Sequence, residues 1–198
     1  MFPISHFNIT RTPFYYYDKT LLSNTLAKLI RLAGERNYHI HYAVKANANP
    51  EILKLIAASG IGADCVSGGE IKAALEAGFP AKKIVFAGVG KADWEIEYAL
   101  EKKIFCFNVE SAEELSVIEE LAKKKENIAS IALRINPNID AHTHEYITTG
   151  LSENKFGIPI EMLDSIFSQI QRSPHVQLVG FHFHIGCLLY TSPSPRDA

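Results

Sequence analysis

The sequence has few cysteines and no excess of charge of either sign. Its three cysteines, Cys65, Cys106 and Cys187, are an odd number at wide spacing, which excludes a disulfide framework and favours reduced thiols. The 20 Lys and Arg residues nearly balance 22 Asp and Glu residues, so a strongly basic nucleic-acid binder is also excluded. Hydrophobic side chains make up 47% of the chain, which is typical of a protein with a buried core and not of a disordered chain.

Neither a membrane span nor a secretory signal is visible in the sequence. The longest apolar runs, residues 84–89 and 179–183, are far shorter than the ~20 residues that a membrane-spanning helix requires. The first six residues lack the basic start and apolar stretch of a secretory signal. We therefore expect a cytoplasmic protein with no membrane partner.

Short apolar runs alternate with segments of helical periodicity from residue 21 onward. Helices are expected over residues 21–36, 49–59, 69–77, 91–103, 111–125 and 159–172. Asn49 before Pro50 and the capping box Ser111-Ala112-Glu113-Glu114 mark two of the helix starts. Strands are expected over residues 38–45, 62–67, 84–89, 104–109, 130–136 and 177–185. Because strands separated by helices pair in parallel, the pattern predicts a parallel α/β sheet.

The predicted strands carry apolar side chains on one face and polar side chains on the other. Along residues 130–136 the odd positions are Ile or Leu, whereas the even positions include Arg134 and Asn136. An open, doubly wound sheet is covered by helices on both faces and would be apolar on both. A (β/α)8 barrel fits better, since its helices cover only the outside and polar groups line its upper lumen. We expect a TIM-type barrel truncated to about six βα units.

Lys45 is the leading candidate for chemistry, because it ends the first predicted strand on the polar face. This position would point its amine into the mouth of the barrel, where apolar walls favour the neutral, nucleophilic form. A Schiff-base lysine is one interpretation, and a solvated surface lysine is the other.

Histidine pairs on two predicted strands leave a metal site open as an alternative. His39 and His41 share the inward face of the first strand, and His182 and His184 share that of the sixth. Such a pair can hold zinc, as in a metal-dependent barrel hydrolase, or can simply fill the lumen. No Asp or Glu is well placed beside either pair, which weighs against zinc.

Two further groups of polar residues follow predicted strands. Asp64, at the end of the second strand, and Arg134 are expected to form a buried ion pair, because each charge in a lumen needs the other. Gly88-Val89-Gly90-Lys91 resembles a phosphate loop only weakly, and a strand-to-helix turn explains it better.

Ordered motifs along the chain resemble those of the fold type III pyridoxal-phosphate decarboxylases. They are Tyr42-Ala43-Val44-Lys45-Ala46-Asn47, Gly62-Ala63-Asp64-Cys65-Val66-Ser67-Gly68-Gly69-Glu70, Leu133-Arg134-Ile135-Asn136-Pro137 and Phe183-His184-Ile185-Gly186. Within that group, residues 140–144 and 149–157 most resemble the diaminopimelate decarboxylase branch. The resemblance runs from residue 12 to residue 186, and its order and spacing make it more specific than any single motif.

The resemblance implies a barrel of the alanine racemase and group IV decarboxylase kind, a separate β-domain, and an obligate homodimer with active sites at the interface. Residues 1–20 would then supply a strand to a missing β-domain, and residues 21–186 would form a partial pyridoxal-phosphate-binding barrel. At Cys187 the sequence leaves the family pattern, which continues with Ser-Gln. Residues 187–198 are therefore expected to be an extraneous or disordered tail, with the last two barrel units absent.

The resemblance also implies pyridoxal 5'-phosphate as the cofactor, with Lys45 as the Schiff-base lysine and His184 stacked on the pyridine ring. Asp64 and Arg134 match positions near the cofactor, and the role of Glu70 is left open. The implied reaction of the intact protein is decarboxylation of meso-2,6-diaminopimelate to L-lysine, a step of lysine biosynthesis.

The sequence alone also allows other activities. A sibling decarboxylase acting on ornithine or arginine would share the Lys45 and His184 motifs, and a regulator could bind pyridoxal phosphate without turnover. The family's acid that partners the pyridine nitrogen has no counterpart here. We therefore expect the 198-residue chain itself to be inactive.

Overall fold

The computed structural model describes residues 4–136 and 156–184, and the chain divides into the units Met1–Tyr38 and His39–Ala198. The first unit contains the helices α1 (Ile4–Phe7) and α2 (Lys19–Gly34). The Asp18 carboxylate caps α2 by accepting a hydrogen bond from Leu21 N at 2.9 Å, so this helix begins two residues before the predicted start. No helix in the described part of the chain is both long and apolar enough to cross a membrane.

Residues 11–18 lead to α2 without forming a strand. Aromatic rings of this unit contact one another instead, and the Phe7 centroid lies 5.4 Å from that of Phe14 and 5.1 Å from that of Tyr16. Tyr15 is 88% exposed. A role for this segment as a strand of another domain stays a prediction.

The second unit is a parallel sheet whose strands alternate with helices. The strands are β1 (His41–Ala43), β2 (Gly62–Cys65), β3 (Ile84–Phe86), β4 (Cys106–Val109), β5 (Ala129–Asn136), β6 (Ile158–Pro159) and β7 (Val176–Phe183). The order follows the chain from β1 to β6, and β7 pairs with β5. All pairings among these strands are parallel, which confirms the predicted α/β architecture. The two-residue β6 is the one strand that the sequence pattern missed.

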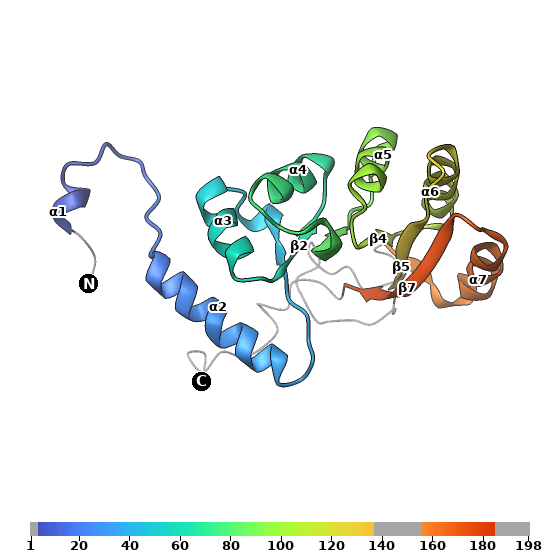
Figure 1. Cartoon of the computed structure of the whole chain (residues 1–198), viewed down its shortest axis with the longest axis horizontal. Helices are drawn as coiled ribbons and strands as arrows, with labels where there is room; N and C mark the ends of the chain where they lie inside the picture. The colour runs from blue at the N-terminus through green and yellow to red at the C-terminus, as the bar shows by residue number, and fades with distance from the viewer. Residues whose placement is uncertain (1–3, 137–155, 185–198) are drawn as a thin grey trace. The chain divides into compact units, whose positions relative to one another are not determined.

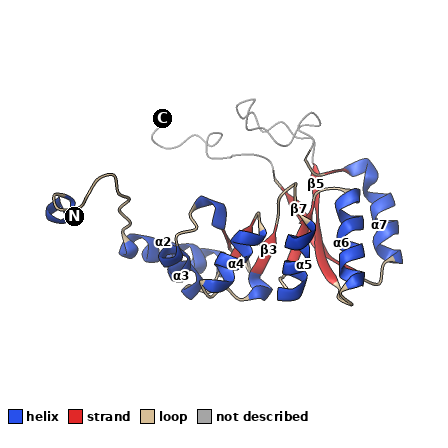
Figure 2. Ribbon diagram, turned by 90° about the horizontal axis from the view of Figure 1, so that it is seen from above, coloured by secondary structure: helices blue, strands red, loops and turns tan. Residues whose placement is uncertain are grey.

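Five helices connect these strands. They are α3 (Pro50–Ala58), α4 (Gly68–Glu76), α5 (Asp93–Lys102), α6 (Ala112–Lys124) and α7 (Leu163–Arg172). Figure 1 shows them following one another in chain order along the sheet, and Figure 2 shows α4 to α7 on one side of the strands. The predicted caps are present, since Asn49 Oδ1 accepts from Glu51 N at 3.0 Å and Ser111 Oγ accepts from Glu114 N at 3.2 Å.

The strand register separates apolar and polar side chains onto two faces, because aligned residues of parallel strands point the same way. One face carries the buried apolar residues Ala63, Cys65, Ile84, Phe86, Phe107, Val109, Ile131 and Leu133. The opposite face carries His41, Ala43, Asp64, Val85, Cys106, Asn108, Ala132, Arg134, Gly180 and His182. The predicted alternation of apolar and polar faces is therefore confirmed.

The sheet is open at both ends within residues 4–136 and 156–184. There β1 pairs only with β2, and β7 pairs only with β5. An irregularity in β7 lets Leu178 align with Ile131 and Gly180 with Ala132, so that Leu178 shares the apolar face with Phe181. The side chain of Phe181 is nevertheless 53% exposed.

Candidate functional site

Lys45 lies just beyond β1 and not on it. Residues Val44–Ala46 form a 3₁₀ turn, closed by a hydrogen bond from Asn47 N to Val44 O at 3.1 Å. The Tyr42 hydroxyl donates to Asn47 O at 3.1 Å, and the Val44 side chain is fully buried, so both fix the turn. The predicted strand position of Lys45 is wrong, and its side chain is exposed to solvent. It remains at the carboxyl end of β1.

Asp64 lies on the polar face of β2, aligned with Ala43 of β1. Its Oδ1 atom is buried and has no hydrogen-bond partner within the described residues. Burial raises the pKa of the Asp64 carboxyl, while the positive charge of Lys45 opposes that rise. A buried carboxyl oxygen without a partner is a place where a bound polar group would complete the hydrogen bonding.

Arg134 pairs with Glu110 and not with Asp64. Arg134 Nη1 donates to Glu110 Oε2 at 2.5 Å, and the two side chains are only 10% and 6% exposed. Asp64 forms no ion pair in the described part of the chain, so the predicted Asp64–Arg134 pair is wrong. The register explains the difference, because Glu110 directly follows β4 beside Arg134 on β5, whereas Asp64 is three strands away on β2.

Glu110 is the site residue that the sequence reasoning missed. It continues the alternation of β4, in which Asn108 lies on the polar face and Val109 on the apolar face. Extending that alternation by one residue past the strand would have found it.

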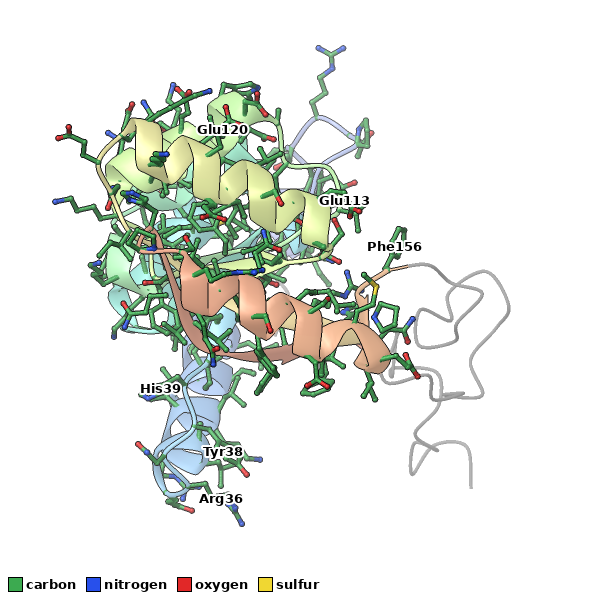
Figure 3. All side chains as sticks on the ribbon, turned by 90° about the vertical axis from the view of Figure 1, so that its right-hand side faces the viewer. Arg36, Tyr38, His39, Glu113, Glu120 and Phe156 are labelled. Atoms are coloured by element: carbon green, nitrogen blue, oxygen red, sulfur yellow. The ribbon has the colours of Figure 1, made fainter. Side chains whose placement is uncertain are left out.

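Two residues that follow the undescribed segment pack against Arg134. Its guanidinium lies 5.8 Å from the centre of the Phe156 ring. Gly157 has φ 89°, and a Cβ at that position would lie 3.1 Å from Arg134 O, so glycine is required there. Figure 3 shows Phe156 at the same end of the molecule as Glu113 in the first turn of α6. This end is the carboxyl edge of the sheet.

His182 on β7, and His184 just after it, lie at the same carboxyl edge of the sheet. His182 is aligned with Arg134, and burial lowers its pKa to about 4, with the charge of Arg134 adding to the effect. Its Nδ1 atom is buried without a partner among the residues described. Burial also lowers the pKa of His184, and the positive charges of Arg134 and Lys45 lower it further. Lys45 and His184 thus follow the two outer strands, β1 and β7, at the same edge of the sheet.

Lys91 is fully engaged by the protein. Its side chain is 1% exposed, and Nζ contacts Glu114 Oε1 at 2.5 Å, Gly88 O at 2.7 Å and Asn108 O at 2.8 Å. These bonds use all three ammonium protons, so none is left for a phosphate. The interpretation of residues 88–91 as a strand-to-helix turn is confirmed.

Glu70 and Glu114 play matching roles at two helix starts. Glu70 Oε2 accepts from Val66 N at 2.8 Å, and its own N–H donates to Ser67 Oγ at 3.2 Å. Glu114 Oε2 likewise accepts from Glu110 N at 2.9 Å. Each glutamate therefore fixes the residue that precedes the helix cap. For Glu70, whose role was open, the contact anchors the loop that follows Asp64.

Other candidate residues do not join this edge. His39 is exposed, and His41 Nδ1 lies 3.5 Å from Ala63 O. Within the described ranges, no group of three or more His, Cys, Asp or Glu side chains is placed to hold a metal ion. Cys65 and Cys106 are free thiols, as expected. Cys187 and residues 140–144 lie outside the described residues.

The sequence is similar to a known protein family and to curated proteins. The sequence profile described as "Pyridoxal-dependent decarboxylase, pyridoxal binding domain" matches residues 23–192. The chain is 58% identical over 187 residues to the diaminopimelate decarboxylase of Bacteroides thetaiotaomicron, an alignment that covers 94% of this chain and 48% of that protein.

Solved structures of similar proteins agree with the fold. Diaminopimelate decarboxylase from M. jannaschii superposes with a TM-score of 0.87 at 38% identity, over 98% of this chain and 46% of that one. The Helicobacter pylori enzyme, in complex with L-lysine, gives 0.84 at 45% identity, over 94% and 47% of the two chains. The chain thus spans about half the length of the relatives it matches.

Proposed function

Because the chain belongs to the pyridoxal-dependent decarboxylase family, we propose that it binds pyridoxal 5'-phosphate at the edge formed by Lys45, Asp64, Arg134 and His184. One observation carries the proposal. Residues remote in sequence meet at the carboxyl edge of the sheet, because Lys45 follows β1, Asp64 lies on β2, Arg134 lies on β5 and His184 follows β7. Asp64 also has a buried carboxyl oxygen for which the described chain supplies no partner, and a bound polar ligand would satisfy it.

Each residue has surroundings that suit a role toward the cofactor. The exposed amine of Lys45 is accessible and would hold the cofactor covalently through Nζ. His184, whose lowered pKa favours the neutral imidazole, can lie against an aromatic ring without bringing a positive charge. Arg134 provides a permanent positive charge that Glu110 holds in place. The bound cofactor supplies a ring that accepts the electrons left by a departing carboxylate.

For the whole protein we propose decarboxylation of meso-2,6-diaminopimelate to L-lysine. Support comes from the curated relative at 58% identity, which is a diaminopimelate decarboxylase, and from a solved relative in complex with L-lysine. Since this chain spans about half of those proteins, it is expected to show no turnover alone. The homodimer and the cytoplasmic location also belong to this proposal.

The test joins residues 1–186 to the C-terminal half of the Bacteroides thetaiotaomicron relative and measures carbon dioxide release from meso-diaminopimelate, ornithine and arginine. We expect release from meso-diaminopimelate and its loss in Lys45→Arg, whereas Lys54→Arg, an exposed lysine of α3, retains it. Release from ornithine or arginine alone would assign a sibling activity, and cofactor binding without release would assign a regulator. Activity that survives Lys45→Arg but not a chelator would indicate a metal-dependent enzyme.

A further inference from the structure

Four charged residues, linked by two ion pairs and one bond to a backbone N–H, connect the loop between β3 and α5 to the proposed cofactor edge. They are Lys91, Glu114, Glu110 and Arg134. We propose that Glu110 is a positioning residue that holds the Arg134 guanidinium toward the cofactor, and that Lys91 and Glu114 hold Glu110 in turn. This inference rests on the proposed function, because it concerns the same site.

The contact between Glu110 and Arg134 is a single charged hydrogen bond. Glu110 Oε2 accepts from Arg134 Nη1, while Glu110 Oε1 is buried with no partner in the described part of the chain. A guanidinium held at one nitrogen can still rotate about that bond, and the Phe156 ring beneath it limits the rotation. The direction in which Arg134 points therefore depends on where the Glu110 carboxylate is held.

The backbone of Glu110 is fixed by Glu114 and not by the sheet. The aligned part of β4 ends at Val109, so Glu110 lies just beyond its pairing with β5. Glu110 N donates instead to Glu114 Oε2 at 2.9 Å. Burial raises the pKa of Glu114, and the adjacent Lys91 ammonium opposes that rise. Lys91 thus favours the charged carboxylate that accepts bonds at both oxygens.

Lys91 is buried and contacts Arg134 only indirectly, through Glu114 and Glu110. Its other bonds go to Gly88 O in the loop after β3 and to Asn108 O on β4. With two positive and two negative groups, the four residues are neutral overall, which allows them to be buried. Removing Lys91 leaves Glu114 without its cation and frees the segment that carries Glu110.

The experiment compares Glu110→Gln and Lys91→Met with the unchanged chain, using two readouts. The first is the ¹⁵N NMR signals of the Arg134 guanidinium, which report whether its rotation is restricted without any cofactor. The second is the dissociation constant for pyridoxal 5'-phosphate. We expect averaged Arg134 signals in both variants and roughly tenfold weaker cofactor binding in Glu110→Gln, as loss of a charged hydrogen bond implies.

A matched control uses Lys125, whose Nζ lies 2.8 Å from Glu101 Oε1 between α5 and α6, away from the site. Lys125→Met should leave both readouts unchanged. If Glu110→Gln fails to fold, the double variant Lys91→Met/Glu114→Gln, which removes one charge of each sign, takes its place.

The role of Glu110 and the binding of the cofactor can fail separately. Unchanged Arg134 signals in folded variants would overturn the inference, as would averaged signals with cofactor affinity equal to that of the control. If the unchanged chain binds no cofactor while its Arg134 signals respond as expected, the positioning of Arg134 stands and the proposed function fails.

Discussion

The stability of the fold should depend on pH through His182. Burial lowers the pKa of this imidazole from 6.5 to about 4 in the folded chain, whereas unfolding restores its ordinary value. Between those two pH values the unfolded state binds a proton that the folded state does not. The free energy of unfolding is therefore highest above pH 6.5 and falls as the pH falls toward 4.

The size of this effect follows from the gap between the two pKa values. A gap from 6.5 to about 4 sets an upper limit of roughly 3 kcal/mol on the contribution of His182 to the unfolding free energy, because solvent screens the exposed part of the ring. Arg134 contributes by repelling the imidazolium, and Glu110 opposes it by attraction. Glu114 and Asp64 have raised pKa values and give the opposite dependence on pH, because their contribution falls as the pH rises. The difference in unfolding free energy between the chain and a His182 variant therefore isolates the part of the pH dependence that is due to His182.

The assay is urea unfolding of the chain and of His182→Gln at pH 7.0 and pH 4.5. We expect the original chain to lose more stability than the variant over this interval, by up to about 2 kcal/mol. His39→Gln, which changes an exposed histidine, is the control and should behave as the original chain does. If His182→Gln loses as much stability as the original chain, the His182 imidazole is not desolvated and the reasoning is refuted.

Three further perturbations test the packing around the site. Arg134→Met should cost about 3 to 5 kcal/mol in urea unfolding, because Glu110 stays buried without its cation, and adding Glu110→Gln should restore most of it; additive losses would contradict the pair. Gly157→Ala should cost about 1 to 3 kcal/mol and more than Gly78→Ala, which has a similar φ but open space around it; equal losses would remove the close approach to Arg134 as a cause. Amide hydrogen exchange should be faster in β1 and β7 than in β3 and β4, because each outer strand has one unpaired edge among the described strands, and strong protection of both in a monomer would refute this.

Periodicity was sufficient to predict the faces of the sheet. Alternation along residues 130–136 placed Arg134 opposite the buried Ile131 and Leu133, and the register agrees. Local signals also located helix starts, since the Asn49 and Ser111 side chains cap where their spacing indicates. These features depend on residues close in sequence, which a pattern contains.

Lateral distances and turns could not be predicted in the same way. Alternation says that Asp64 and Arg134 share a face, but not that three strands separate them or that Glu110 lies nearer. The 3₁₀ turn at Lys45 depends on the burial of Val44 and on where β1 stops pairing with β2, and both are set by tertiary packing. Both features are decided by packing between segments distant in the chain.

The most direct test of the proposed site is the position of the lysine that holds the cofactor. The protein would be incubated with pyridoxal 5'-phosphate, reduced with borohydride and mapped by peptide mass spectrometry, with Lys54→Arg as the matched control to Lys45→Arg. We expect a pyridoxyl group on Lys45, lost in Lys45→Arg and retained in Lys54→Arg. A pyridoxyl group on another lysine, with Lys45 unmodified, would contradict it.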